Sequence, residues 1–419
     1  MNTNLLHRSI LNSACCAGLA LTASVALAAD WPQFRGPAHD DISQETGLLK
    51  EWPKEGPALA WKMNGLGGGF SGVSIVGKLL FTMGDRDGKE FVIAVSLATH
   101  KEAWATEVGQ AFENPNGAGP RCTPTVAGNR VFALTPQGEL VCLQITDGKI
   151  TWRKNLKADF GGKMMSGWGY SESPLADGKN VICTPGGSQG AVVALNQQTG
   201  ALAWRCQEIT DSSAYSSLVP VEFGGKRQYI QLSDQNVYAV AADSGKLLWK
   251  AARKGNVAVV PTPVFKDGIV FVTSGYGVGC NAFKVTPQGD SFSAEQIYAN
   301  KDMADHHGGV ILVGDYVYGH SDSGGKLKCL ELKTGHVVWE DRCVGKGSVT
   351  CADGMLYVRA EGGAGAVALV QASPDGYKEA GRFDQPDRSQ KNSWPHPVVA
   401  GGQLYLRDQD LLLCYNVNK

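Results

Sequence analysis

The segment Ala191-Val-Val-Ala-Leu-Asn-Gln-Gln-Thr-Gly-Ala-Leu-Ala-Trp204 decides the fold. Apolar residues alternate on both sides of a turn at Thr199-Gly200, which is the pattern of a β-hairpin. The same pattern recurs where a turn residue is followed, four positions later, by Trp104, Trp152, Trp249 or Trp339. In the copy that ends at Trp104, His100 stands where the other copies have glycine. Repetition with one fixed spacing predicts a repeated structural unit, in which we expect the tryptophan to pack the outer strand onto its own unit.

The spacing of these units identifies the architecture. Their closing aromatic residues are 41 to 52 residues apart: Trp61, Trp104, Trp152, Trp204, Trp249, Tyr298, Trp339 and Phe383. Units of about 40–50 residues with four short alternating strands are typical of propeller blades, whereas a helical solenoid would show a 3.6-residue period.

The two ends of the repeat array complement each other. Leu59-Ala-Trp61 looks like the end of a unit without its beginning, and the last unit stops after Leu411–Asn416 without a final strand. Pairing the two closes the ring and leaves no large open sheet edge. The sequence therefore predicts an all-β, eight-bladed β-propeller with four-stranded antiparallel blades, the last blade being closed by an N-terminal strand.

Three segments are expected along the chain. Residues 1–28 have the pattern of a secretory signal, with an apolar run from Ile10 to Leu27 and an A-x-A cleavage site that ends at Ala28. Cleavage near Ala28 would give a periplasmic or secreted protein with no transmembrane segment in the mature chain. Residues 29–56, rich in proline and glycine, are expected to form an N-terminal strap, and residues 57–417 the propeller.

Composition excludes some classes of function and leaves others open. The 39 basic and 40 acidic residues are balanced, so no nucleic acid is expected as a partner. Export permits disulfides, but nine cysteines follow the signal, and an odd number leaves at least one thiol free or paired between chains. Cys142, Cys329 and Cys414 occupy a small-residue position of the repeat, and we expect them to be buried packing residues.

The repeated strand–Thr/Ser-Gly–strand–Trp pattern over residues 57–417 resembles the pyrroloquinoline-quinone-like repeat propellers. This family includes quinoprotein alcohol dehydrogenases and a periplasmic lipoprotein that assists outer-membrane barrel assembly. The dehydrogenases hold their quinone between a tryptophan and a disulfide of adjacent cysteines, beside calcium and a catalytic aspartate. Here the adjacent pair Cys15-Cys16 lies within the predicted signal, and no cysteine is placed for lipid attachment. The resemblance therefore implies the fold more strongly than either activity.

Candidate site residues come from the start of each innermost strand and from nearby loops, which meet at one mouth of a propeller channel. A concave site with a few convergent polar groups and aromatic walls is the expected binding site. Nine residues form this predicted site: Arg121, Trp168, Glu172, Tyr215, His306, His307, Lys346, Trp394 and His396. Arg121, Lys346 and a protonated His307 could hold an anion. The alternative, that these side chains only line a water-filled channel, stays open.

Two other polar clusters, at residues 305–307 and 407–410, are considered as metal or catalytic sites. In Asp305-His306-His307, adjacent histidines on an extended strand would point to opposite faces, so no metal site is predicted there. Arg407-Asp-Gln-Asp410 is interpreted as an acidic hairpin tip. A general base or a calcium-ligating carboxylate is the alternative.

The sequence thus predicts an exported propeller with a ligand-binding or protein-scaffolding role through the channel mouth and loops. Its expected partner is a periplasmic or envelope protein, or a small anionic ligand. The alternative is an alcohol or sugar oxidoreductase that depends on pyrroloquinoline quinone and calcium, in which Trp168 or Trp394 would stack on the quinone. Recognition of a carbohydrate by these two tryptophans is a third possibility. No catalytic residue is assigned.

Overall fold

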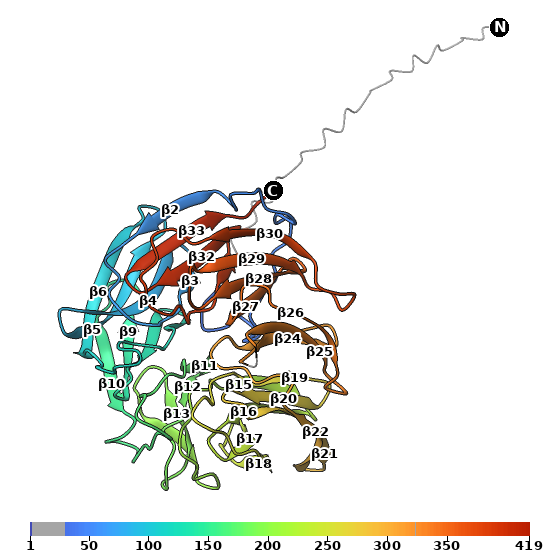
Figure 1. The fold of residues 1–419 in the computed structure, drawn as a ribbon. Coiled ribbons are helices and arrows are strands. Elements are labelled where there is room, and N and C mark those ends of the chain that lie inside the picture. Colours follow the sequence, from blue (N-terminus) through green and yellow to red (C-terminus); the bar gives the residue numbers. More distant parts are fainter. Residues whose placement is uncertain (2–29, 323) are drawn as a thin grey trace.

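The chain forms a closed ring of eight β-sheets (Figure 1). The computed structural model describes residue 1, residues 30–322 and residues 324–419. Apart from Met1, the predicted secretory signal lies outside the described residues. Each sheet is a four-stranded antiparallel blade, and one of them carries a fifth, parallel strand. This confirms the predicted eight-bladed propeller.

Blades 1 to 4 follow the chain in order, and each begins with its innermost strand. Blade 1 contains β3 (Ser74–Val76), β4 (Leu79–Arg86), β5 (Lys89–Ser96) and β6 (Lys101–Gln110). Blade 2 contains β7 (Thr125–Ala127), β8 (Arg130–Leu134), β9 (Glu139–Gln144) and β10 (Ile150–Asn155). Blade 3 contains β11 (Leu175–Asp177), β12 (Asn180–Cys183), β13 (Val192–Asn196) and β14 (Leu202–Cys206). Blade 4 contains β15 (Val219–Phe223), β16 (Lys226–Leu232), β17 (Asn236–Ala241) and β18 (Leu247–Ala252).

Blades 5 to 7 continue the order, and blade 8 joins the two ends. Blade 5 contains β19 (Val264–Lys266), β20 (Ile269–Ser274), β21 (Gly279–Gln288) and β22 (Ser291–Asn300). Blade 6 contains β23 (Val310–Val313), β24 (Tyr316–Ser321), β25 (Lys326–Glu331) and β26 (Val337–Asp341). Blade 7 contains β27 (Gly347–Ala352), β28 (Met355–Ala360), β29 (Ala366–Gln371) and β30 (Glu379–Asp384). Blade 8 contains β31 (Val398–Ala400), β32 (Gln403–Asp408), β33 (Leu411–Asn416) and β2 (Leu59–Met63).

The predicted ring closure is confirmed by the pairing of β2 with β33. The two strands are antiparallel, with Trp61 opposite Cys414. In Figure 1 the blue strand β2 lies beside the red strand β33. The outermost strand of the last blade therefore comes from the other end of the chain.

The closing aromatic residues pack on the following blade. Trp204 of β14 donates from Nε1 to the backbone oxygen of Ala242 in blade 4, at 3.1 Å. Trp152 of β10 donates in the same way to Gln197 in blade 3, at 2.9 Å. A Cβ added at Gly245 would lie 2.3 Å from the Trp204 ring, so the turn glycine and the indole are in direct contact. The tryptophan also packs onto its own blade as expected, since the rings of Trp152 and Phe132 in blade 2 have centroids 6.0 Å apart, but its indole N–H reaches across to the neighbouring hairpin.

Two blade junctions depart from this arrangement. Trp249 donates to Gln228 of its own blade, at 2.8 Å, where the following β21–β22 hairpin is the long one of blade 5. At the closing junction, Trp61 stacks on His100, with ring centroids 4.6 Å apart and planes 14° from parallel. His100 has a φ of 54°, so it adopts the backbone conformation of the glycine that it replaces. The exceptional histidine of the first repeat thus supplies the ring contact that closes the propeller.

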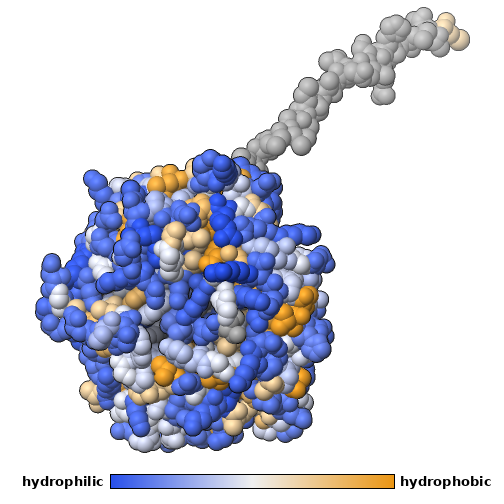
Figure 2. All heavy atoms as spheres, in the orientation of Figure 1, coloured by the Kyte–Doolittle hydropathy of each residue, from blue (hydrophilic) through white to orange (hydrophobic). Residues whose placement is uncertain are grey.

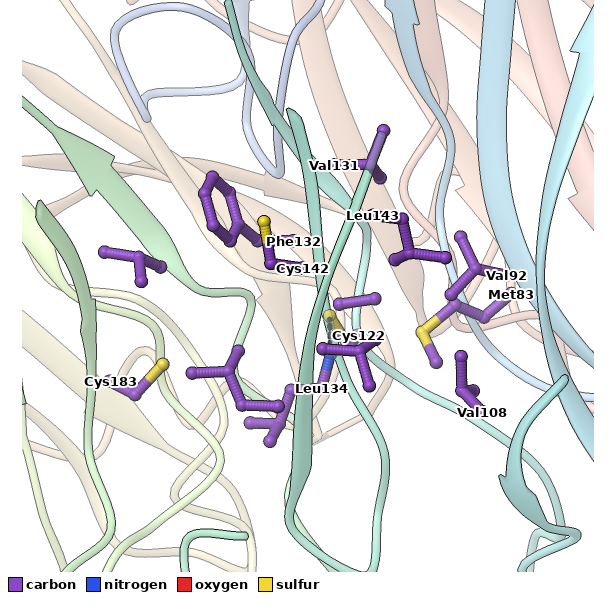
Figure 3. Close-up of a cluster of buried hydrophobic side chains, with 14 of the residues drawn as sticks. Met83, Val92, Val108, Cys122, Val131, Phe132, Leu134, Cys142, Leu143 and Cys183 are labelled. Carbon is purple, nitrogen blue, oxygen red and sulfur yellow. Dashed lines mark hydrogen bonds between the residues drawn. The ribbon is translucent and has the colours of Figure 1, made fainter. Parts of the chain in front are cut away.

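The hydrophobic core lies between adjacent blades and contains most of the cysteines. Figure 3 shows Cys142 beside Phe132, and Cys122 near Leu134, in the cluster that joins blades 1 to 3. Cys142, Cys329 and Cys414 are buried and free, which confirms their prediction as packing residues. All nine cysteines that follow the predicted signal are free thiols, and Cys343 is the partly exposed one.

The N-terminal segment crosses the channel. Trp31 exchanges two backbone hydrogen bonds with Ile75 of β3, at 2.8 and 2.7 Å. Arg35 donates to the backbone oxygen of Val310 in β23, at 2.8 Å. Strand β1 (Ile42–Ser43) then pairs in parallel with β27 of blade 7. Because these contacts join inner strands on separate sides of the ring, residues 31–43 fill part of the channel.

The surface seen in Figure 2 is largely hydrophilic, with small and separate apolar areas. Among the described residues, no helix has the length and apolar character needed to cross a membrane.

The contact between a closing tryptophan and the next turn can be tested with two glycine substitutions. Gly245 and Gly88 have φ values of +72° and +75°, but a Cβ at Gly88 would meet nothing within 4 Å. Alanine at positive φ costs about 1 kcal/mol at either position. We expect Gly245→Ala to lower the free energy of unfolding by about 1–3 kcal/mol more than Gly88→Ala, because Trp204 must move. Urea unfolding measures both variants, and equal losses would contradict the proposed blade contact.

Candidate functional site

A cavity of about 470 Å³ lies at one mouth of the channel. Residues from the openings of the blades, the loops between them and the N-terminal segment line it. Eight of the nine predicted site residues are among them: Arg121, Trp168, Tyr215, His306, His307, Lys346, Trp394 and His396. The blade alignment read from the sequence therefore brings these residues together.

Glu172 is the exception, and the structure does not bring it to the cavity. Its carboxylate is buried and accepts a hydrogen bond from the backbone N–H of Thr184 at the end of β12. Burial raises the pKa of Glu172 to about 7. The side chain alternation of the segment turns this residue into the blade, while its neighbours Ser171 and Ser173 face the cavity.

One side of the cavity is built from stacked rings. Phe70 and Trp394 have ring centroids 3.9 Å apart, Trp394 and His307 are 4.2 Å apart, and His307 and His306 are 3.8 Å apart. Tyr276 adds an edge contact to His306 at 4.6 Å. These five residues, here called the aromatic column, come from blades 1, 8, 6 and 5. The column therefore braces widely separated parts of the mouth against one another.

The aromatic column corrects two expectations. His306 and His307 do not point to opposite faces, because the segment between β22 and β23 is a loop and its two imidazole rings stack. Trp394 cannot stack on a planar ligand, because His307 covers one face of its indole and Phe70 the other. Trp394 presents only its edge to the cavity.

Lys346 lies beside the two histidines of the aromatic column and contacts two carboxylates. Its Nζ is 3.3 Å from Glu361 Oε1 and 3.6 Å from Asp322 Oδ1, and it donates to Nδ1 of His306. His307 Nδ1 is 3.6 Å from Glu361 Oε2, which is longer than a hydrogen bond. Lys346 is therefore neutralised by two carboxylates within the site.

The protonation of this cluster follows from burial and from the charge of Lys346. Burial lowers the pKa of His306 to about 3, and His307 and Lys346 act in the same direction. Burial likewise lowers the pKa of His307. Burial opposes ionisation of Glu361, but the adjacent His307 and Lys346 outweigh it and hold the pKa of Glu361 below its usual value. At neutral pH both histidines are thus neutral and Glu361 is charged.

Arg121 is also committed to internal contacts. Its guanidinium donates to the backbone oxygens of Gly117 and Gly119 and lies over the ring of Phe112, 4.7 Å from the centroid. Burial lowers the pKa of Arg121 to about 10, so it keeps its charge at neutral pH. The arginine fixes the loop between β6 and β7 against the cavity.

The N-terminal segment supplies site residues that the sequence prediction did not include. Trp31, Phe34, Arg35 and Asp41 line the cavity. Arg35 and Asp41 form a buried ion pair at 2.9 Å, and His396 Nδ1 donates to the same carboxylate at 2.9 Å. No sequence periodicity links these residues to the blades, so no signal was available to place them.

Asp322 and Glu361 were also missed, although the sequence does carry a signal for them. Each directly follows the second strand of its blade, β24 or β28. The second strand runs back toward the mouth, so the residue after it arrives beside the start of the inner strand. Aligning this position across the repeats would have found both carboxylates.

The Arg407-Asp-Gln-Asp410 segment forms the predicted hairpin tip between β32 and β33, but Asp410 is its one exposed residue. Asp408 is fully buried and bonds to Arg388 at 2.7 Å and to Gln385 at 2.9 Å. Asp410 accepts hydrogen bonds from the backbone N–H groups of Gly65 and Gly67, at 2.8 and 2.7 Å. Asp410 therefore holds the loop that carries Phe70 into the column, and Asp408 holds the loop between β30 and β31, which carries Trp394.

A G-x-S-x-G pentapeptide occurs at Gly186–Gly190. It joins strands β12 and β13, and Ser188 is exposed on the loop. A hydrolase nucleophile of this motif stands on a strand-to-helix turn, so the pentapeptide is a blade connection here.

A family model described as outer membrane protein assembly factor BamB matches residues 88–341, which is more than half of the chain. The chain belongs to this family. The propeller resemblance inferred from the repeats is thereby confirmed, since quinoprotein structures share the fold as well.

The chain is also similar to individual known proteins. It is 26% identical over 155 residues to the outer membrane protein assembly factor BamB of Bordetella pertussis, covering 37% of this chain and 34% of the relative. The match thus spans about a third of the length of that curated relative. The structure of BamB from Moraxella catarrhalis superposes with a TM-score of 0.58 at 14% identity, covering 85% of this chain and 97% of that one. The structure of quinohemoprotein alcohol dehydrogenase from Comamonas testosteroni superposes with a TM-score of 0.64 at 12% identity, covering 95% of this chain and 82% of that one. At these identities the two structures are similar in fold.

The cavity residues do not fit a calcium-bound quinone. In the part of the chain that the structure describes, no group of three or more His, Cys, Asp and Glu residues could hold a metal ion. The adjacent pair Cys15-Cys16 lies outside the described residues, and the cysteines within them are free. Trp394 has no open ring face, and Lys346 is already paired with carboxylates. The site lacks the donor set that such a cofactor needs.

The burial of neutral His306 predicts a loss of stability in acid. Its pKa is about 3 in the folded chain and 6.5 in the unfolded chain, so the unfolded state binds the proton first as the pH falls. Between pH 7 and pH 5 this single group is expected to remove about 2 kcal/mol from the free energy of unfolding. His306→Gln should flatten the fall by about that amount. The exposed His336→Gln is the control, and an unchanged slope in His306→Gln would disprove the assignment.

Proposed function

We propose that this protein is an exported scaffold that binds an envelope protein taking part in outer-membrane protein assembly, and that the partner docks on the face around the cavity. The family membership and the name of the Bordetella pertussis relative support this role. The proposed location is the periplasm, reached through the signal at residues 1–28.

The observation that carries the docking site is the arrangement of the cavity rim. Tyr276 and Val257 line the cavity and are 51% and 40% exposed. Tyr276 is held in place, because its backbone N–H donates to Asp322 at 3.0 Å and its ring contacts His306 edge-on. Rigid aromatic residues around a pocket are typical anchors of protein interfaces.

An oxidoreductase that depends on pyrroloquinoline quinone is disfavoured, because Trp168 has no group of three or more His, Cys, Asp and Glu residues beside it, among the described residues, that could hold the calcium ion. Of the two tryptophans expected to stack on the quinone, Trp394 cannot do so, because Phe70 and His307 cover the two faces of its indole. A small anionic ligand is also disfavoured, because Lys346 and Arg35 are paired with carboxylates and the guanidinium of Arg121 already donates to two backbone oxygens. A protein partner that binds to the cavity rim needs neither an unpaired cation nor a cofactor in the site.

Docking at the rim can be tested by photo-crosslinking in cells of the native host. A photoreactive phenylalanine analogue replaces Tyr276 in one variant and Leu202, 52% exposed on the outer strand β14, in the control. We expect the Tyr276 variant to give a product that contains a protein of the outer-membrane assembly machinery. The same product from both positions, or none from Tyr276, would refute the docking site.

Export can be tested separately by N-terminal sequencing of the protein purified from the periplasmic fraction. Processing is expected to leave a chain that starts near Ala29. Recovery of the full-length chain in the cytoplasmic fraction would contradict the proposed location.

A further inference from the structure

The cavity wall opposite the aromatic column is made of hydroxyl groups. Five residues from the openings of blades 2, 3 and 4 form it: Thr123, Ser171, Ser173, Tyr215 and Ser217. We call this set the hydroxyl wall. Thr123, Ser173 and Ser217 are almost fully buried, and they line the cavity. The hydroxyl wall and the aromatic column thus give the cavity two chemically different sides.

Backbone hydrogen bonds fix the hydroxyl wall in place. Ser173 Oγ accepts from the backbone N–H of Thr123 at 3.0 Å, and Ser217 Oγ accepts from that of Ser173 at 3.0 Å. A serine hydroxyl has one donor proton besides its acceptor sites. Within the described part of the chain, Ser217 Oγ donates to no partner, whereas the Ser173 hydroxyl interacts with the buried thiol of Cys122. The Ser217 hydroxyl therefore keeps a proton for an acceptor in the cavity.

The charges at the cavity favour an uncharged ligand. Lys346 lies between Glu361 and Asp322, and Arg35 pairs with Asp41. Arg121 donates to two backbone oxygens. An anion that displaced a carboxylate from Lys346 or Arg35 would leave that carboxylate without its partner, which is costly. An anion that bound Arg121 would have to break its hydrogen bonds to the backbone oxygens of Gly117 and Gly119.

Trp168 supplies an open aromatic face. It lines the cavity from the loop between β10 and β11, and it is only partly buried. Among the described residues, no other ring stacks on its indole, in contrast to Trp394. Its indole is therefore the aromatic surface of the cavity that we assign to the apolar face of a ligand.

We propose that the cavity binds an uncharged saccharide. A sugar ring carries hydroxyls that both donate and accept, which matches the hydroxyl wall, and a C–H face that packs on Trp168. A purely aromatic ligand would cover Trp168 but leave the buried hydroxyls without partners, which costs affinity. The volume of about 470 Å³ lies in the range of small-molecule sites. This binding site does not depend on the proposed docking of a protein at the rim.

The test is isothermal titration of the purified protein with three neutral disaccharides: cellobiose, maltose and N,N′-diacetylchitobiose. D-Glucuronate serves as the charged comparison. We expect at least one disaccharide to bind about tenfold more tightly than D-glucuronate, which corresponds to ~1.4 kcal/mol. Absence of binding by all three, or tighter binding of D-glucuronate, would overturn the proposal.

Variants locate the bound sugar. Trp168→Ala should weaken binding by about tenfold, whereas Trp168→Phe should keep most of the affinity, because it retains a ring. Ser217→Ala should weaken binding by removing a donor. Leu202→Ala, on the outer strand β14, is the control and should bind like the parent chain. Unchanged affinity in both Trp168→Ala and Ser217→Ala would place the sugar elsewhere and refute the site. The crosslinking at Tyr276 tests protein docking and not sugar binding, so either proposal can fail while the other stands.

Discussion

The propeller depends on one recurrent contact, in which the aromatic residue of an outermost strand lies on the turn of the next blade. The indole needs a hydrogen-bond acceptor and a flat backbone surface, and a turn with a glycine at positive φ provides both. The contact is directional, so a blade that makes it fixes the position of the following blade, whereas Trp249 bonds within its own blade. At the last junction His100 replaces the glycine and stacks on Trp61, which joins the ring to its own beginning. Blade order and ring closure thus follow from one side chain and one turn.

The repeat explains why so much of the fold could be predicted. A strand pair, a turn and a closing aromatic residue form a local pattern, and its periodicity gave the number of blades and the pairing of Leu59–Met63 with Leu411–Asn416. The path of the N-terminal segment could not be predicted in this way. Its position is determined by isolated long-range contacts, such as Arg35 with Val310 and Trp31 with Ile75. Nothing in its own sequence periodicity encodes those partners.

In the candidate site, the positions of most residues could be predicted from the repeat, but their interactions could not. Residues at the openings of the blades could be aligned from the repeat, and eight of them do meet in one cavity. Their interactions could not be foreseen, because ring stacking between His307 and Trp394 and the pairing of Lys346 with Glu361 depend on loops of different blades. Glu172 shows the limit of such an alignment, since a shift of one residue along a strand turns a side chain from the cavity into the blade. Likewise, the sequence predicted Lys346 as a group that holds an anion, but the structure pairs its charge with Glu361.

The pairing of β2 with β33 also governs when the molecule can finish folding. The two strands come from nearly opposite ends of the chain, so the eighth blade stays incomplete until the last strand has been synthesised. Strand β2 must remain unpaired throughout that interval, and contacts between distant segments form slowly. During this time an unpaired edge is exposed to other chains. Because the ring is closed by a strand from the N-terminal part of the chain, the time during which an edge stays exposed depends on how long synthesis of the remaining chain takes.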